Sequence, residues 1–171
     1  GLADVDAITL SMTRLADGPD AGTAAIAILV AVAANSASKS VLAIVTAGGV
    51  LATTNVGANA SAINGGILEG PAGGDLTVIQ NNTSATLTIG SQIADNTSAS
   101  ALVKSGAGTL VLNNSNTYTG GTTLNAGILN VSQNDALGTG ALTFTSNATL
   151  QAGGSGASLP NTVNLGTFSN V

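Results

Sequence analysis

The segment GAGTLVLNNSNTYTGGTTLNAGILNV, residues Gly106–Val131, decides which fold this chain can form. It carries no charged residue, and Gly, Asn and Thr stand where a globular domain would have helix formers. Short runs of apolar and β-branched residues, such as Thr109–Leu112, are bounded by Gly and Asn. This pattern is typical of short strands joined by sharp corners. The segment therefore predicts β-structure and offers few side chains for chemistry.

Similar motifs recur on both sides of this segment. One leucine from each motif can be placed in a single series. The number of residues between neighbouring members of this series is always close to the length of one solenoid turn, about 20 residues. The members of the series are Leu51, Leu68, Leu87, Leu110, Leu129 and Leu150. The chain after about Thr46 is therefore predicted to form a short parallel β-helix with turns of about that length.

Individual strands of this β-helix can be predicted from the alternation of polar and apolar residues. The expected strands are Leu76–Ile79, Thr86–Ile89, Thr109–Leu112, Leu142–Phe144, Thr162–Leu165 and Thr167–Val171. The last two leave an uncapped sheet edge, so edge-to-edge self-association of the chain is expected.

The beginning of the chain has a different pattern, which predicts two α-helical segments. Apolar residues recur every three or four positions from Leu2 to Leu15, and Gly18-Pro19 then breaks the first helix. Ala21–Ala34 is apolar on every side, and extended to Val45 it is long enough to cross a bilayer. Residues 21–45 are therefore expected to contact a membrane, the alternative being a helical cap on the β-helix. These patterns divide the chain into residues 1–46 and 47–171.

The composition excludes several classes of function. Charged residues make up 6% of the chain and the net charge is −5, which argues against a nucleic-acid partner. The absence of Cys and His removes thiol chemistry, zinc sites and His-based acid–base catalysis. Mean hydropathy is +0.43, which disfavours disorder. No cofactor or metal is expected.

The segment from Gly106 to Leu142 resembles the autotransporter-associated β-strand repeat of Gram-negative passenger domains. The motifs that carry the likeness are G-x-G-T-L from Gly106, N-T-Y-T-G-G-T from Asn116, N-A-G-x-L from Asn125 and A-L-G from Ala136. The resemblance covers residues 47–171 and implies a right-handed parallel β-helix on the cell surface or secreted. It implies export and display of a passenger, with adhesion as one role, and no catalytic residue.

Residues 1–48 resemble a different family, the C-terminal end of an uncharacterised integral-membrane family related to the MgtC/SapB proteins. The stretch Asp4–Ser11 and the A-N-x-x-x-K pattern from Ala34 to Lys39 carry this likeness. A membrane location and an unknown transport or sensing role are the implied alternatives. The two parts are either a natural fusion or two joined reading frames.

Several residues are candidates for a functional or structural site. In the first part these are Asp4, Asp6, Asn35 and Lys39, as polar positions of a membrane segment or as helix-capping and surface residues. In the second part the candidates are structural positions of the repeat motif: Gly106, Gly108, Thr109, Leu110, Tyr118, Gly120, Gly121, Gly127, Leu129 and Gly138. Tyr118 is expected to pack within a loop, the alternative being contact with a partner.

The remaining polar motifs do not predict a site. Asp75, Asp95 and Asp135 are scattered along the chain, so a glycan-active β-helix enzyme is only a distant third hypothesis. The Thr-x-Thr pairs that begin at Thr86, Thr117 and Thr143 do not recur at one common step, which disfavours an ice-binding face. The N-x-S/T sequons are read as Asn corners or ladders: Asn59, Asn81, Asn82, Asn96, Asn113 and Asn147. The sequence thus predicts a non-catalytic structural passenger whose surface ligand is unidentified.

Overall fold

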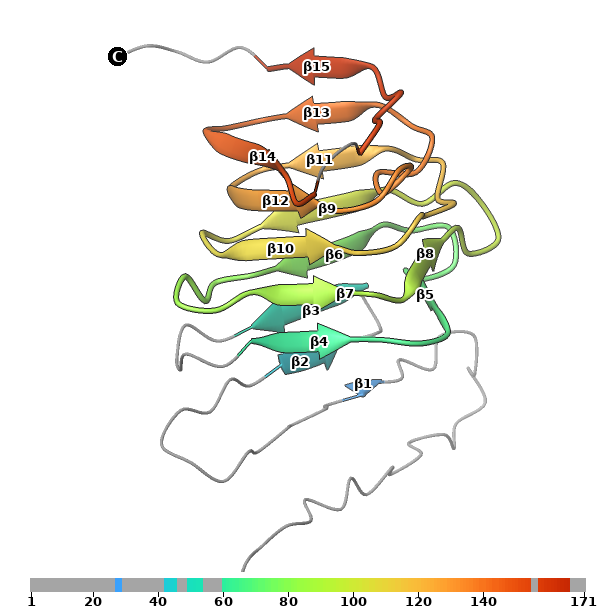
Figure 1. Cartoon of the computed structure of the whole chain (residues 1–171). Helices are drawn as coiled ribbons and strands as arrows, with labels where there is room; N and C mark the ends of the chain where they lie inside the picture. Colours follow the sequence, from blue (N-terminus) through green and yellow to red (C-terminus); the bar gives the residue numbers. More distant parts are fainter. Residues whose placement is uncertain (1–26, 29–41, 46–48, 54–59, 155–156, 167–171) are drawn as a thin grey trace, which may run out of the picture.

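The computed structural model describes residues 27–28, 42–45, 49–53, 60–154 and 157–166. Nearly all of the described strands belong to two long sheets that face each other across a narrow rod (Figure 1). Sheet A runs in the order β1 (Ala27–Ile28), β2 (Leu42–Val45), β3 (Val50–Thr53), β6 (Leu76–Ile79), β9 (Leu102–Ser105), β11 (Thr122–Leu124), β13 (Leu142–Phe144) and β15 (Val163–Leu165). Sheet B consists of β4 (Ser61–Ile63), β7 (Leu87–Ile89), β10 (Thr109–Leu112), β12 (Gly127–Val131) and β14 (Ala148–Ala152).

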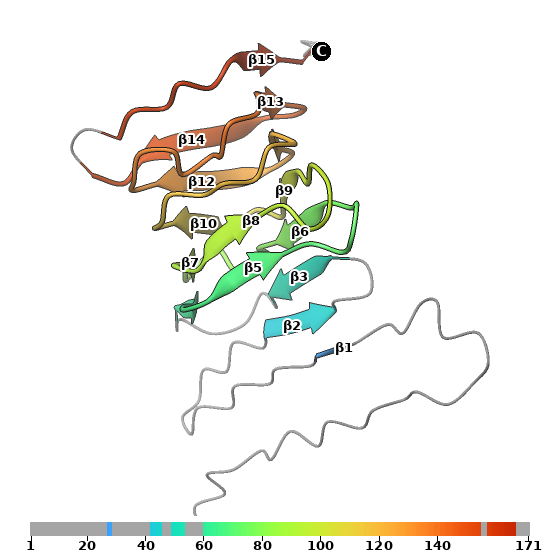
Figure 2. The ribbon, with the colours of Figure 1, turned by 90° about the vertical axis from the view of Figure 1, so that its right-hand side faces the viewer.

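A third side closes each turn of the rod. It holds the two-stranded sheet C, formed by β5 (Ile67–Glu69) and β8 (Gln92–Ala94), which faces the viewer in Figure 2. Turn 1 consists of β3, β4 and β5, and turn 2 of β6, β7 and β8. Turns 3, 4 and 5 carry one strand in each long sheet, β9–β10, β11–β12 and β13–β14, and their third side contains no described strand. The chain is therefore a parallel β-solenoid of about five turns, as the sequence predicts.

The register gives the true length of each turn. Leu102 pairs with Thr122, and Thr122 pairs with Leu142, so these two turns have the length of about 20 residues that the repeats predict. Turn 2 is longer, because Leu76 pairs with Leu102. The extra residues are divided between the β6–β7 loop and the β8–β9 loop. The predicted step therefore describes the later turns but underestimates the earlier ones.

The predicted leucine series is only partly one column. Leu87, Leu110, Leu129 and Leu150 do pair in register in sheet B. Leu51 instead pairs with Val78 in sheet A, and Leu68 pairs with Ile93 in sheet C. The series was wrong at these two positions because every side of a turn needs an inward apolar residue. A leucine motif therefore does not reveal which side of the solenoid it belongs to.

The core is a stack of inward columns from both long sheets. Sheet B contributes the leucine column and, beside it, Ile89, Leu112 and Val131 in register. Sheet A contributes Leu76, Leu102 and Leu142, and the third side adds Ile93, Tyr118 and Leu137. Neighbouring strands are about 4.8 Å apart, so each inward side chain contacts its equivalents in the turns above and below. Aliphatic side chains fill this thin interior, and only one buried aromatic ring, Tyr118, lies among the described core residues.

The N-terminal expectation can be compared with the structure in only two short stretches. Ala27–Ile28 and Leu42–Val45 are strands, where the sequence pattern predicts helix. β2 pairs antiparallel with β3, so a β-branched segment extends the edge of sheet A. The rest of the predicted helices, the 46/47 boundary and the predicted strand Thr167–Val171 lie outside the described residues. Among the described residues, the structure has no helix of the length and hydropathy that a membrane span requires.

Candidate functional site

The repeat-motif glycines lie where the backbone turns sharply or where neighbouring turns meet. Gly106 has a φ of 78°, and a Cβ atom there would collide with the carbonyl oxygen of Gln80 in the turn below. Gly138 has a φ of 58° and lies directly against the carbonyl oxygen of Tyr118. Gly108, Gly120, Gly121 and Gly127 are also close to the backbone of a neighbouring turn. The remaining motif residues lie in strands, Thr109 and Leu110 in β10 and Leu129 in β12.

The third side of turns 3 and 4 is held by a buried asparagine. The Asn116 Oδ1 atom accepts a hydrogen bond from the Ile93 N–H at 2.7 Å, and its Nδ2 donates to the Ala136 carbonyl at 2.6 Å. Ile93 belongs to turn 2 and Ala136 to turn 4, so one side chain joins three successive turns. Asn116 therefore replaces part of the backbone ladder that sheet C provides in turns 1 and 2.

Tyr118 lies in the same segment and is completely buried. Its hydroxyl shares a hydrogen bond of 2.6 Å with the Thr122 Oγ1 atom, which is also buried. Burial raises the pKa of Tyr118 well above its usual range, while the bond to Thr122 opposes part of this shift. The tyrosine thus has a packing role, and its ring has no surface for contact with a partner.

A lysine occupies the core at the corner between sheets A and B. Lys104 follows Leu102 and Val103 in β9, and its side chain has no exposed surface. Its Nζ atom donates to the carbonyl oxygens of Ser105 at 2.8 Å, Gly106 at 2.7 Å and Ala126 at 3.0 Å. Burial lowers the pKa of Lys104 to about 8. The strict alternation of β9 could have predicted this inward position, because Lys104 lies two residues after an inward leucine.

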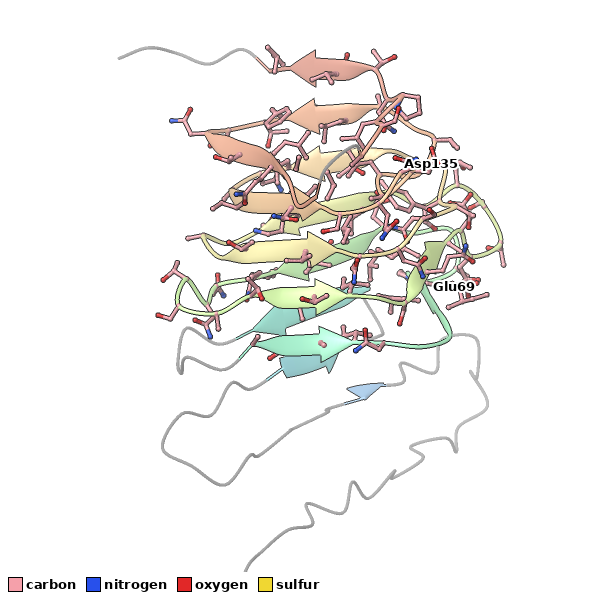
Figure 3. All side chains as sticks on the ribbon, in the orientation of Figure 1. Glu69 and Asp135 are labelled. Atoms are coloured by element: carbon pink, nitrogen blue, oxygen red, sulfur yellow. The ribbon has the colours of Figure 1, made fainter. Side chains whose placement is uncertain are left out.

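The acidic residues of the described chain are on or beside the third side. Glu69 is in β5 and Asp135 is in the turn after β12, on the same edge of the rod (Figure 3). The Asp95 carboxylate accepts hydrogen bonds from the backbone N–H groups of Ser100 and Thr119 at 2.8 and 3.0 Å, and from the Thr119 hydroxyl at 2.8 Å. These donors lower the pKa of Asp95, the Ser100 N–H contributing most.

These acids join turns of the solenoid. Asp95 connects the β8–β9 loop to turn 3, and the Asp75 Oδ1 atom likewise accepts a hydrogen bond from the Ala101 N–H at 2.9 Å. Within the described part of the chain, no group of three acidic residues could hold a metal ion. The arrangement accounts for Asp75 and Asp95 as loop supports.

Other sequence motifs also have structural places. The threonines Thr88, Thr117 and Thr143 belong to sheet B, the third side and sheet A respectively, so the Thr-x-Thr pairs form no common array. Among the sequon asparagines, Asn82 accepts a hydrogen bond from the Ser84 N–H, and Asn96 donates to the Gly70 carbonyl of the turn below. Asn59 and all four N-terminal candidates, Asp4, Asp6, Asn35 and Lys39, lie outside the described residues.

Comparison with known proteins shows a likeness of this solenoid to autotransporter passengers. Residues 102–131 match the passenger-associated-transport-repeat family, and residues 1–47 match a domain of unknown function, DUF4010. The chain is 42% identical over 86 residues to the BmaC autotransporter adhesin of Brucella suis biovar 1 (strain 1330). That stretch is 50% of this chain but only 2% of the adhesin. No solved structure matches the chain. The solenoid therefore carries a passenger-type repeat and is related, over half of the chain, to an autotransporter adhesin.

Proposed function

We propose that the chain contributes a non-catalytic, structural β-solenoid module to a surface-displayed autotransporter passenger with a role in adhesion. The observation that supports this most strongly is the place of the repeat motif in the fold. The motif's glycines form corners and close backbone contacts, its leucines fill the core, and Tyr118 is buried. The passenger-type repeat at residues 102–131 and the similarity to an adhesin support display at the cell surface.

Adhesion can be tested with the whole chain coupled to inert beads. Beads that carry the folded chain are expected to bind cultured epithelial cells or immobilised extracellular matrix more strongly than beads that carry a heat-denatured sample. Equal binding by the two samples would contradict an adhesive role of the folded solenoid. A panel of polysaccharides incubated with the same chain, with and without Ca²⁺, should show no cleavage. Turnover of any of them would contradict the non-catalytic role.

We further propose that the chain has two parts of different origin, joined near Thr46. The match of residues 1–47 to DUF4010 and the passenger-type repeat after it support this division. A long DNA read across the codons for residues 44–54 in the source organism tests the junction. One unbroken reading frame would support a natural fusion of the two parts. A break in the frame would separate the two parts and remove the first from the function of the solenoid.

A further inference from the structure

The inward position of Lys104 is unusual because its column is otherwise apolar on both sides. In sheet A, Lys104 pairs with Val78 in the turn below and with Leu124 in the turn above. Both of these neighbours are fully buried. A lysine is almost never fully buried unless its charge is compensated. Its presence in this column therefore needs a specific compensating group.

The compensating groups are three backbone carbonyls. An ammonium group has three N–H donors and no acceptor, and each donor of Lys104 has one carbonyl within 3.0 Å. Two of the carbonyls, those of Ser105 and Gly106, belong to the corner of turn 3. The third belongs to Ala126, at the same corner of turn 4. One ammonium group thus binds two successive turns.

No carboxylate takes part in this site within the described chain. Asp75 and Asp95 bind N–H groups of the loop before β9, and Asp95 also binds that of Thr119. Glu69 and Asp135 lie on the third side. Burial is the cause of the lowered pKa of Lys104, and the value of about 8 leaves the amine mostly protonated at pH 7. Among the described residues, the positive charge is therefore stabilised by backbone carbonyl dipoles.

We propose that this corner is an ammonium-binding site built from backbone carbonyls, which Lys104 fills as an internal ligand and which holds turn 4 in place on turn 3. The class of ligand that fits the site is a primary alkylammonium ion. Divalent metal ions and neutral alcohols are not expected to replace it, since neither combines three N–H donors with a single charge. This inference is independent of the adhesive function proposed above.

The first test compares Lys104→Met with Leu124→Met in urea unfolding of the whole chain. Lys104→Met keeps most of the side-chain volume but leaves the Gly106 and Ala126 carbonyls without their donor. Its folding equilibrium constant is expected to fall by about 30-fold or more. Leu124→Met, a volume-conserving change in the same column, should cost less than about tenfold. A Lys104→Met variant as stable as the unsubstituted chain would overturn the proposal, because the lysine would then serve only to fill space.

The second test asks whether an added ligand restores the site. Lys104→Ala removes three methylene groups and the ammonium, which together correspond to n-propylammonium. This ion is expected to raise the urea midpoint of Lys104→Ala, or to restore β-rich circular dichroism if that variant does not fold alone. n-Propanol and tetramethylammonium at equal concentration, and n-propylammonium on the unsubstituted chain, should have no such effect. Equal effects of amine and alcohol, or no restoration at all, would overturn the ammonium site.

A third measurement observes the ammonium group directly. The chain has two lysines, Lys39 and Lys104, so ¹⁵N-lysine labelling gives a simple NMR spectrum. A buried and fully hydrogen-bonded NH₃⁺ group exchanges its protons slowly, so one ammonium signal should persist at neutral pH and disappear in Lys104→Met. The absence of such a signal from the folded chain would contradict the three-carbonyl geometry.

Discussion

Turns 1 and 2 and turns 3 and 4 close the same solenoid by different means. In the first pair, the third side is a true sheet, in which β5 and β8 pair in parallel. In the second pair, described strands are confined to sheets A and B. The third side is held by single backbone hydrogen bonds, such as that from the Thr117 N–H to the Ile93 carbonyl, and by the side chain of Asn116. The comparison shows that a solenoid side can replace continuous strand pairing with isolated backbone hydrogen bonds and a buried side chain without interrupting the core.

The two pairs also differ in length. Turn 2 carries a long loop between β8 and β9 that is supported by Asp95, whereas turns 3 and 4 are shorter. Glycines of both pairs lie against the backbone of a neighbouring turn, as Gly49 does against Asp75 and Gly138 against Tyr118. Substitutions at such glycines should be less tolerated than a substitution at Gly65, which has open space around it.

Among the variants that test this comparison, Gly138→Ala should cause the largest loss of stability. The residue has a positive φ, and an added Cβ atom would collide with the Tyr118 carbonyl, so both the backbone and its neighbour must move. We expect a loss of roughly 3 kcal/mol or more in the free energy of unfolding, measured by urea denaturation.

Gly65→Ala in turn 1 is the matched control. Gly65 has a φ of 82°, but a methyl group added there would have no atom within 4 Å, so only the backbone cost of about 1–2 kcal/mol applies. Equal losses for the two glycines would show that the close contact at Gly138 has no energetic importance.

Asn116→Ala should cause the second largest loss of stability. The change leaves the Ile93 N–H and the Ala136 carbonyl buried without their side-chain partner, at roughly 1–3 kcal/mol each. Urea unfolding measures the loss, and hydrogen exchange should show faster exchange of the Ile93 amide. The exposed Asn113 of the same turn is the control, and its replacement by Ala should remain within about 0.5 kcal/mol. If both variants were equally stable, the third side would not depend on Asn116.

How much of the fold and of the contacts between turns could be predicted from the sequence differs from residue to residue. Alternation and Gly/Asn corners predicted the solenoid and several strand bounds correctly, including those of β6 and β10. The side to which each motif belongs was not predictable, because Leu51 and Leu68 satisfy the same local pattern as Leu87. Asn116 and Lys104 were also missed as turn connectors, since their partners are backbone atoms, several of them in other turns of the solenoid.

Tyr118 offers a smaller and spectroscopically direct test. As the single tyrosine of a chain without tryptophan, it can be followed by its absorbance as the pH rises. Because burial raises its folded pKa above the unfolded value of about 10, this residue's contribution to stability is lost as pH rises beyond that value. We expect the ring to ionise only as the chain unfolds. Ionisation near pH 10 with an intact circular dichroism spectrum would contradict its burial.

Tyr118→Phe isolates the hydroxyl from the ring. The loss of the hydrogen bond to Thr122 should lower the free energy of unfolding by about 1–2 kcal/mol. Thr122→Val together with Tyr118→Phe should cost less than the two separate losses combined, because the partners share one bond. Strictly additive losses in urea unfolding would show that the two hydroxyls are not coupled.

Asp95→Asn should have the smallest effect, limited to acid conditions. The lowered pKa of Asp95 means that its contribution is present above about pH 4 and is lost as pH falls through the folded value. The thermal midpoint of the variant should therefore fall less between neutral and acid pH than that of the unsubstituted chain. Asp135→Asn removes the same charge at an exposed turn and serves as the control. An unchanged pH profile in Asp95→Asn would show that the β8–β9 loop does not need this carboxylate.

The most direct test of the account is the register of turns 4 and 5. The chain has no cysteine, so a disulfide can form only between introduced residues. Thr123 and Thr143 pair in parallel, with strands about 4.8 Å apart, which suits a disulfide. Thr123→Cys/Thr143→Cys should therefore oxidise rapidly within the monomer. Thr123→Cys/Asn164→Cys, two strands apart in sheet A, should not. Equal oxidation of both pairs, or crosslinks only between chains, would contradict the stacked solenoid.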